Sequence, residues 1–152
     1  MSVSAIRRRE LPTSPWAALA LIVVAQFMVI LDVAIVNVAL PSIETDLGFT
    51  QSGLEWVVTA YAIVFGGFLL LGGRAGGLIG RRRLFLAGLV LFTAASFVCG
   101  IANGETMLIV SRGIQGLGAA LVPPAALSIV TTPFREGPER TQALGVWAAI
   151  AV

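Results

Sequence analysis

The segment WAALALIVVAQFMVILDVAIVNVAL, from Trp16 to Leu40, contains one charged residue, Asp32, in 25 positions. About 20 consecutive apolar residues are enough to cross the hydrocarbon core of a bilayer as an α-helix. The segment is longer than the apolar core of a secretory signal peptide, and no A-x-A cleavage site follows closely after it. It therefore predicts a retained membrane-spanning helix.

Four further apolar segments follow the first one. Short breaks rich in glycine and proline separate them, and they cover residues 54–73, 84–102, 107–130 and about 142 to 152. With 57% hydrophobic and 12% charged residues, the chain lies outside the range of ordinary soluble domains. The pattern predicts an all-α membrane protein, a polytopic bundle of transmembrane helices.

The last apolar segment is shorter than the others. At a rise of about 1.5 Å per residue, the stretch after Gln142 reaches only about half way across a hydrocarbon core of about 30 Å. We therefore expect a tail over residues 1–15 and a partial bundle over residues 16–152, with a truncated fifth helix.

All ten basic residues are arginines, and most lie in short runs beside the apolar segments. The first segment is preceded by Arg7 to Arg9, and the break between the second and third segments contains Arg74 and Arg81 to Arg83. The charged residues in the breaks before the second segment and after the third are all acidic. Arginine-rich connections stay in the cytoplasm. The alternation predicts a multi-pass protein of the cell membrane with a cytoplasmic N-terminus and the lipid bilayer as its partner. Nucleic-acid binding is not indicated, because it needs an extensive basic face.

Two charged residues lie inside apolar segments. Asp32 lies about 13 Å below the outer end of the first segment, and Arg112 about 8 Å inside the fourth. Charged groups at such depth are rare, face other helices or water, and mark ion or proton pathways. Since an opposite charge nearby favours the ionised form of a carboxylate, an Asp32–Arg112 pair would form a proton-linked switch. A structural hydrogen bond of Asp32, an outward-reaching Arg112 and an ion pair without transport are the alternatives.

Other polar residues of the apolar segments have two interpretations. Gln115 continues the face of Arg112 in a stripe of small and polar residues that is typical of helix contacts. Asn37 lies about 140° around the helix from Asp32, so the two share no face. We interpret Asn37 and Gln115 as interhelical hydrogen-bonding residues or as part of a substrate path. Polar packing between helices is the preferred interpretation for Gln26, Thr59, Tyr61 and Ser96.

The sequence carries no signature of an enzyme. It has no histidine, a single cysteine and no G-x-x-x-x-G-K-[ST] loop. Metal sites and nucleotide sites depend on such residues. We therefore expect no enzymatic activity, no metal site and no cofactor, and we interpret Cys99 as a packing residue.

Three stretches occur in the order LDVAIVNVALP (31–41), GRAGGLIGRRR (73–83) and RGIQGLGAA (112–120). They resemble motifs of the major facilitator superfamily, and the first is similar to the LDxTIVNVALP signature of its fourteen-helix drug:proton antiporter branch. The second is similar to the G-x-L-A-D-R-x-G-R-R-R motif between helices two and three. The third is similar to the RxxQGxGAA motif of helix four.

The resemblance implies the N-terminal part of the major facilitator fold. It also implies proton-coupled export of drugs or other small hydrophobic compounds by alternating access, with the substrate and protons as partners of the intact transporter. It assigns Arg112 to proton coupling. The residues it assigns to a cytoplasmic gating motif are Gly73, Arg74, Gly80, Arg81, Arg82 and Arg83. The acidic residue of that motif is replaced by Gly77 here.

Two other functions remain open from the residues alone. A truncated or accessory membrane protein that does not transport is favoured by the glycine at position 77. A small four-helix exporter that works as an oligomer is disfavoured by the half-length segment after Gln142.

Overall fold

The computed structural model describes residues 15–132 and 137–151, which form five α-helices. These helices are α1 (Pro15–Leu47), α2 (Gln51–Ile79), α3 (Arg81–Gly100), α4 (Glu105–Thr131) and α5 (Pro138–Ala151). No strand occurs in these two ranges, and α1 to α4 are long and apolar enough to cross a membrane. A membrane-spanning helix satisfies its own backbone hydrogen bonds, which lipid cannot do. The predicted fold class, an all-α transmembrane bundle, is confirmed.

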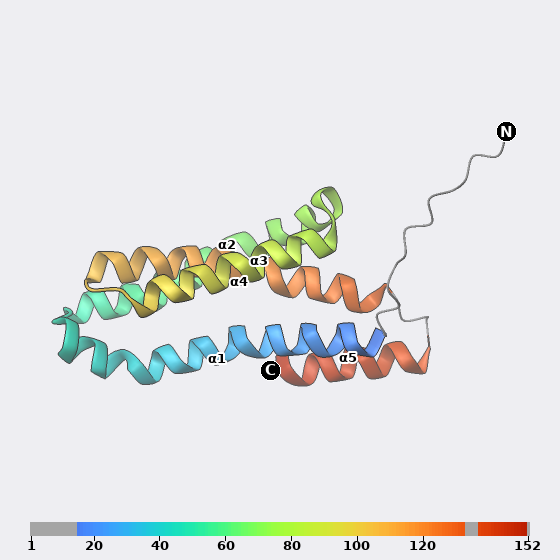
Figure 1. The fold of residues 1–152 in the computed structure, drawn as a ribbon, viewed down its shortest axis with the longest axis horizontal. Coiled ribbons are helices and arrows are strands. Elements are labelled where there is room, and N and C mark those ends of the chain that lie inside the picture. Colours follow the sequence, from blue (N-terminus) through green and yellow to red (C-terminus); the bar gives the residue numbers. More distant parts are fainter. Residues whose placement is uncertain (1–14, 133–136, 152) are drawn as a thin grey trace.

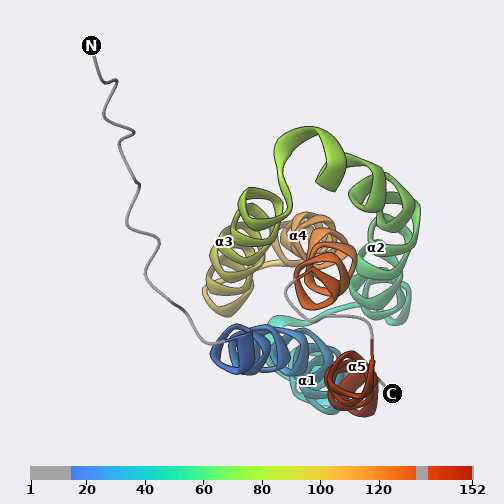
Figure 2. The same ribbon diagram turned by 90° about the vertical axis from the view of Figure 1, so that its right-hand side faces the viewer.

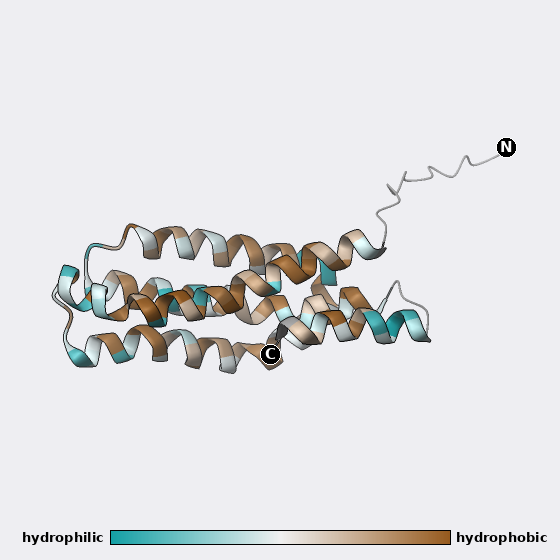
Figure 3. Cartoon of the chain, turned by 90° about the horizontal axis from the view of Figure 1, so that it is seen from below, coloured by the Kyte–Doolittle hydropathy of each residue, from teal (hydrophilic) through white to brown (hydrophobic). Residues whose placement is uncertain are grey.

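Consecutive helices run antiparallel along the long axis of the bundle (Figure 1). Seen from the end, α4 lies in the centre, flanked by α2 and α3, with α1 beneath it and α5 beside α1 (Figure 2). Apolar residues cover the middle of the helices, and hydrophilic residues concentrate towards the two ends (Figure 3). The end that carries the α1–α2 and α3–α4 connections contains Glu44, Asp46, Glu55 and Glu105, and we call it the acidic end. The opposite end, the arginine end, contains Arg74, Arg81, Arg82, Arg83 and Arg140.

The central position of α4 depends on its small residues. A methyl group added to Gly116 would lie 2.6 Å from the Tyr61 carbonyl oxygen of α2. One added to Gly118 would lie 2.6 Å from the Phe92 backbone nitrogen of α3. Both distances are too short for real contacts, so glycine is what lets α2 and α3 approach α4 this closely.

The first helix is longer than predicted, because α1 continues through Pro41 to Leu47 instead of ending at Leu40. A proline inside a helix removes one backbone hydrogen bond and normally kinks or ends it. Here the residues around Pro41 are held by packing, since Leu40 and Ile43 lie against a buried cluster that includes Leu54. Tertiary contacts therefore override the local signal.

The second helix also extends further than predicted. The glycine-rich stretch expected to be a loop is helical up to Ile79, and Gly80 alone connects α2 to α3 with φ 96°. Packing against α4 explains the extension, since a methyl group on Gly72 would lie 2.9 Å from the Ala120 carbonyl oxygen. That oxygen has no intrahelical donor, because Pro124 lacks an N–H. The close approach of α2 thus depends on the glycine at position 72, whose missing side chain lets the two backbones meet.

The remaining boundaries differ slightly from the prediction. The α3 helix begins at Arg81 and ends at Gly100, and α4 runs from Glu105 to Thr131. The α5 helix begins at Pro138 rather than near Gln142, since proline is well suited to the first turn of a helix. Of the predicted tail, residues 1–14 lie outside the described residues, and Arg7 to Arg9 are among them.

Candidate functional site

The centre of the bundle contains an ion pair between α1 and α4. Arg112 Nη1 lies 2.7 Å from Asp32 Oδ2. The Arg112 side chain is 2% exposed and that of Asp32 is 19% exposed. The pairing inferred from the depth of the two residues is therefore present, and the alternative in which Arg112 reaches outward is wrong.

Gln115 connects this pair to a third helix. Its Nε2 donates to Asp32 Oδ1 at 2.7 Å and to Ser96 Oγ of α3 at 2.6 Å. Its Oε1 accepts from Arg112 Nη1 at 2.6 Å and faces the Cys99 thiol at 3.7 Å. A carboxamide has two donor hydrogens and two acceptor lone pairs. All four are used, so Gln115 fixes the relative positions of α1, α3 and α4.

Arg112 is also held by α2. Its Nε donates to the Val57 carbonyl oxygen at 3.3 Å, and its guanidinium carbon lies 4.3 Å from the centre of the Tyr61 ring. A cation over an aromatic face at this distance is stabilised by the quadrupole of the ring. Gly116 contributes indirectly, because its missing side chain lets the Tyr61 backbone approach α4. The charge of Arg112 is thus compensated from α1, α2 and its own helix.

Asp32 borders a cavity of about 220 Å³ between α1 and α3. Ser96 and Thr93 of α3 are its other polar lining residues, and Phe92, Met28, Leu31 and Ile35 complete the wall. The carboxylate is therefore accessible from one side, whereas the guanidinium is enclosed.

Several residues of this network were not predicted as site residues. The polar packing between helices that the sequence predicts for Tyr61 and Ser96, and the packing role of Cys99, agree with the structure. All three side chains also border the Arg112–Gln115 unit. Helical spacing is the signal that groups them. Val57 and Tyr61 are four residues apart on α2, and Ser96 and Cys99 are three apart on α3, so each pair shares one face.

Asn37 does not contribute to this network. Its side chain is exposed, and its Nδ2 donates to the Val33 carbonyl oxygen of its own helix at 2.8 Å. Among residues 15–132 and 137–151 the expected interhelical hydrogen bond of Asn37 is not formed, because an amide close to its own backbone satisfies itself locally. Gln115, by contrast, makes the interhelical bonds expected of it.

The predicted gating residues lie at the arginine end, around the α2–α3 connection. Gly73 and Arg74 belong to α2, Gly80 is the connecting residue, and Arg81, Arg82 and Arg83 form the first turn of α3. Arg81 Nη1 donates to the Ser128 carbonyl oxygen at 3.4 Å and to Thr132 Oγ1, both near the C-terminal end of α4. A cation is favourable at the C-terminal end of a helix. Within residues 15–132 and 137–151, Arg74, Arg82 and Arg83 have no hydrogen-bond or ion-pair partner.

These features define a class of protein. A helix bundle that is apolar outside and holds a carboxylate–guanidinium pair inside is typical of membrane transport proteins, since buried charges are costly unless they have a function. The family model of the Major Facilitator Superfamily matches residues 22–152. The chain belongs to this superfamily, which is a family of membrane transporters and not of enzymes.

The chain is also similar to individual proteins whose names describe export or drug resistance. The chain is 46% identical over 135 residues to the cephamycin export protein CmcT of Amycolatopsis lactamdurans, covering 89% of this chain and 28% of the relative. It is 45% identical over 136 residues to the puromycin resistance protein pur8 of Streptomyces alboniger, covering 90% and 27%. The multidrug resistance protein Stp of Mycobacterium tuberculosis (strain CDC 1551 / Oshkosh) is 43% identical over 125 residues, covering 82% and 23%. The chain thus spans about a quarter of the length of these relatives.

Proposed function

We propose that the chain is the N-terminal part of a proton-coupled exporter of drugs or other small hydrophobic compounds. The observation that carries this proposal is the ion pair of Arg112 and Asp32, with its basic member enclosed and its acidic member open to a cavity. The names of the relatives support the export of antibiotics and drugs as the activity of the whole protein.

Protonation of Asp32 provides the coupling step. The ionised carboxylate holds α1 against α4 through Arg112 and Gln115. A proton on Asp32 removes its charge, and the attraction between the helices falls. Arg112 keeps its bonds to Gln115 and to the Val57 carbonyl oxygen, so the cation stays in place while α1 is released. Alternating access moves one repeat or bundle against another around a central site, and the proposal is that the changed packing of α1 and α4 triggers that movement.

Charge distribution sets the proposed orientation. Described arginines other than the buried Arg112 occupy the arginine end, and the acidic end carries four carboxylates and no described arginine. By the positive-inside rule, the arginine end and with it the N-terminus face the cytoplasm of a cell membrane. The arginines around Gly80 then lie where the family motif would gate the cytoplasmic side.

The test is efflux by the full-length protein in inverted membrane vesicles with an imposed proton gradient. Asp32→Asn is expected to abolish the dependence of efflux on the gradient, because the amide cannot exchange a proton. Asp46→Asn is the matched control, since Asp46 also belongs to α1 but lies at the exposed acidic end. Gradient-dependent efflux by Asp32→Asn at the wild-type rate would exclude Asp32 from coupling. The 152-residue chain alone is expected to show no efflux.

A further inference from the structure

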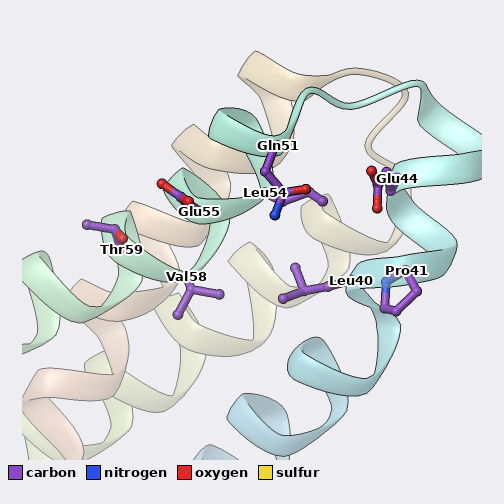
Figure 4. Close-up of a pocket in the computed structure, with 8 residues that line it drawn as sticks. All are labelled: Leu40, Pro41, Glu44, Gln51, Leu54, Glu55, Val58 and Thr59. Atoms are coloured by element: carbon purple, nitrogen blue, oxygen red, sulfur yellow. The ribbon is translucent and has the colours of Figure 1, made fainter.

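A second cavity lies at the acidic end, away from the Asp32–Arg112 pair. It has a volume of about 560 Å³ and lies between the last turns of α1 and the first turns of α2 (Figure 4). Ligand-binding pockets in proteins commonly have volumes of about 300 to 1,000 Å³. The size of this cavity therefore suits a small organic molecule.

Its walls combine apolar and acidic side chains. Leu40 of α1 and Leu54 and Val58 of α2 form the apolar part, and Leu54 is buried. Glu44 projects from α1 and Glu55 from α2, so the two carboxylates stand on opposite sides of the apolar part (Figure 4). Such a cavity offers a surface for an apolar body and two charges for a polar group.

Neither carboxylate is neutralised by the described part of the chain. Glu44 and Glu55 have no hydrogen-bond or ion-pair partner within residues 15–132 and 137–151. The two other acidic residues of this end, Asp46 and Glu105, add negative charge, and no described arginine lies there to offset it. The potential of the cavity is negative, so an anionic ligand is repelled and a cationic one attracted.

We propose that this α1–α2 cavity binds a lipophilic organic cation, with its apolar body against Leu40, Leu54 and Val58 and its positive charge between Glu44 and Glu55. Its place as an outer site on the export path rests on the proposed function and orientation, whereas the binding itself does not. The cavity shares no lining residue with the one at Asp32, so the two sites can be tested separately.

The test uses a pair of ions of the same shape and opposite charge. Radiolabelled tetraphenylphosphonium and tetraphenylborate are each titrated against the full-length protein in nanodiscs of neutral lipid. The protein carries Asp32→Asn, so that the central carboxylate does not contribute. The cation is expected to bind and the anion is not, and the affinity for the cation should fall as salt concentration rises.

Two double variants distinguish binding in the cavity from attraction by the overall negative charge of the acidic end. The double variant Glu44→Gln with Glu55→Gln is expected to lower the affinity for the cation about tenfold, because it removes two exposed charge contacts of ordinary strength. Asp46→Asn with Glu105→Gln removes the same charge from the same end without touching the cavity wall, and its affinity should stay within about twofold of wild type. Equal losses in the two double variants, or no loss in the first, would overturn the proposal.

A third variant tests whether the apolar wall of the cavity contacts the cation and whether the cavity is open to it. Val58→Trp fills the cavity without changing its charge, and it should also weaken cation binding about tenfold. Unchanged affinity would mean that the rest of the protein or a lipid covers this face, and it would refute the site. Because binding is measured without Asp32, failed export with intact cation binding would contradict only the proposed function. Normal export with no effect of the Glu44 and Glu55 substitutions on binding would contradict only the cavity.

Discussion

Gln115 Nε2 donates to Asp32 Oδ1 at 2.7 Å, on the carboxylate oxygen that Arg112 leaves free. Arg112 and Gln115 are three residues apart on α4, so they present their polar groups to α1 from one face. Each oxygen of Asp32 therefore has its own partner from the same helix. The carboxylate is held in one orientation, and loss of its charge weakens both contacts together.

Removal of Arg112 should destabilise the bundle strongly. Arg112→Met leaves the Asp32 carboxyl group without its cation, and breaking one side of a buried pair costs about 3 to 5 kcal/mol. The double variant Arg112→Met with Asp32→Asn should recover most of that loss, because no unpaired charge remains. Unfolding of the full-length protein in mixed detergent micelles measures both values. A double variant as unstable as Arg112→Met alone would contradict the pairing.

The two buried glutamines should respond differently to the same substitution. Gln115→Leu leaves Asp32 Oδ1 and Ser96 without their partner and should cost about 1 to 3 kcal/mol. Gln26 is also buried, yet its Oε1 has no partner among the described residues. Gln26→Leu should therefore be neutral or stabilising. The same detergent unfolding measures both, and equal losses would show that the bonds of Gln115 add nothing to stability.

Hydropathy and charge alone predict the helices and the buried pair, because an aspartate or arginine within an apolar segment is rarely tolerated without a partner or a function. Helix ends are less predictable. Pro41 and the glycines from Gly72 onward signal breaks locally, but packing against neighbouring helices keeps the chain helical there. The contributions of Tyr61 and Ser96 depend on how closely α2 and α3 approach α4, and a local sequence pattern does not predict these interhelical distances. Asn37 shows the reverse case, since its nearest backbone acceptor is on its own helix.

The close approach of α2 and α4 gives a prediction at Gly116. A methyl group there would lie 2.6 Å from the Tyr61 carbonyl oxygen, so Gly116→Ala must push the helices apart and move Tyr61 relative to Arg112. Overpacking of this kind costs about 1 to 3 kcal/mol. Gly113→Ala is the matched control, since its methyl group would meet Val64 at an ordinary 3.9 Å. Thermal denaturation in detergent should show a lower midpoint for Gly116→Ala only, and a similar drop in both would contradict the packing at Gly116.

Two glycines near the α2–α3 connection should show opposite effects of the same change. Gly80 has φ 96° and ψ 131°, a conformation that residues with side chains rarely adopt, so Gly80→Ala should cost about 1 to 3 kcal/mol. Gly77 lies within α2, and a methyl group there would meet no atom within 4 Å. Gly77→Ala should therefore stabilise the protein by about 0.5 to 1 kcal/mol through helix propensity. Thermal denaturation compares the midpoints of the two alanine variants. A lower midpoint for Gly77→Ala would contradict the open space at Gly77 and show that packing requires a glycine there.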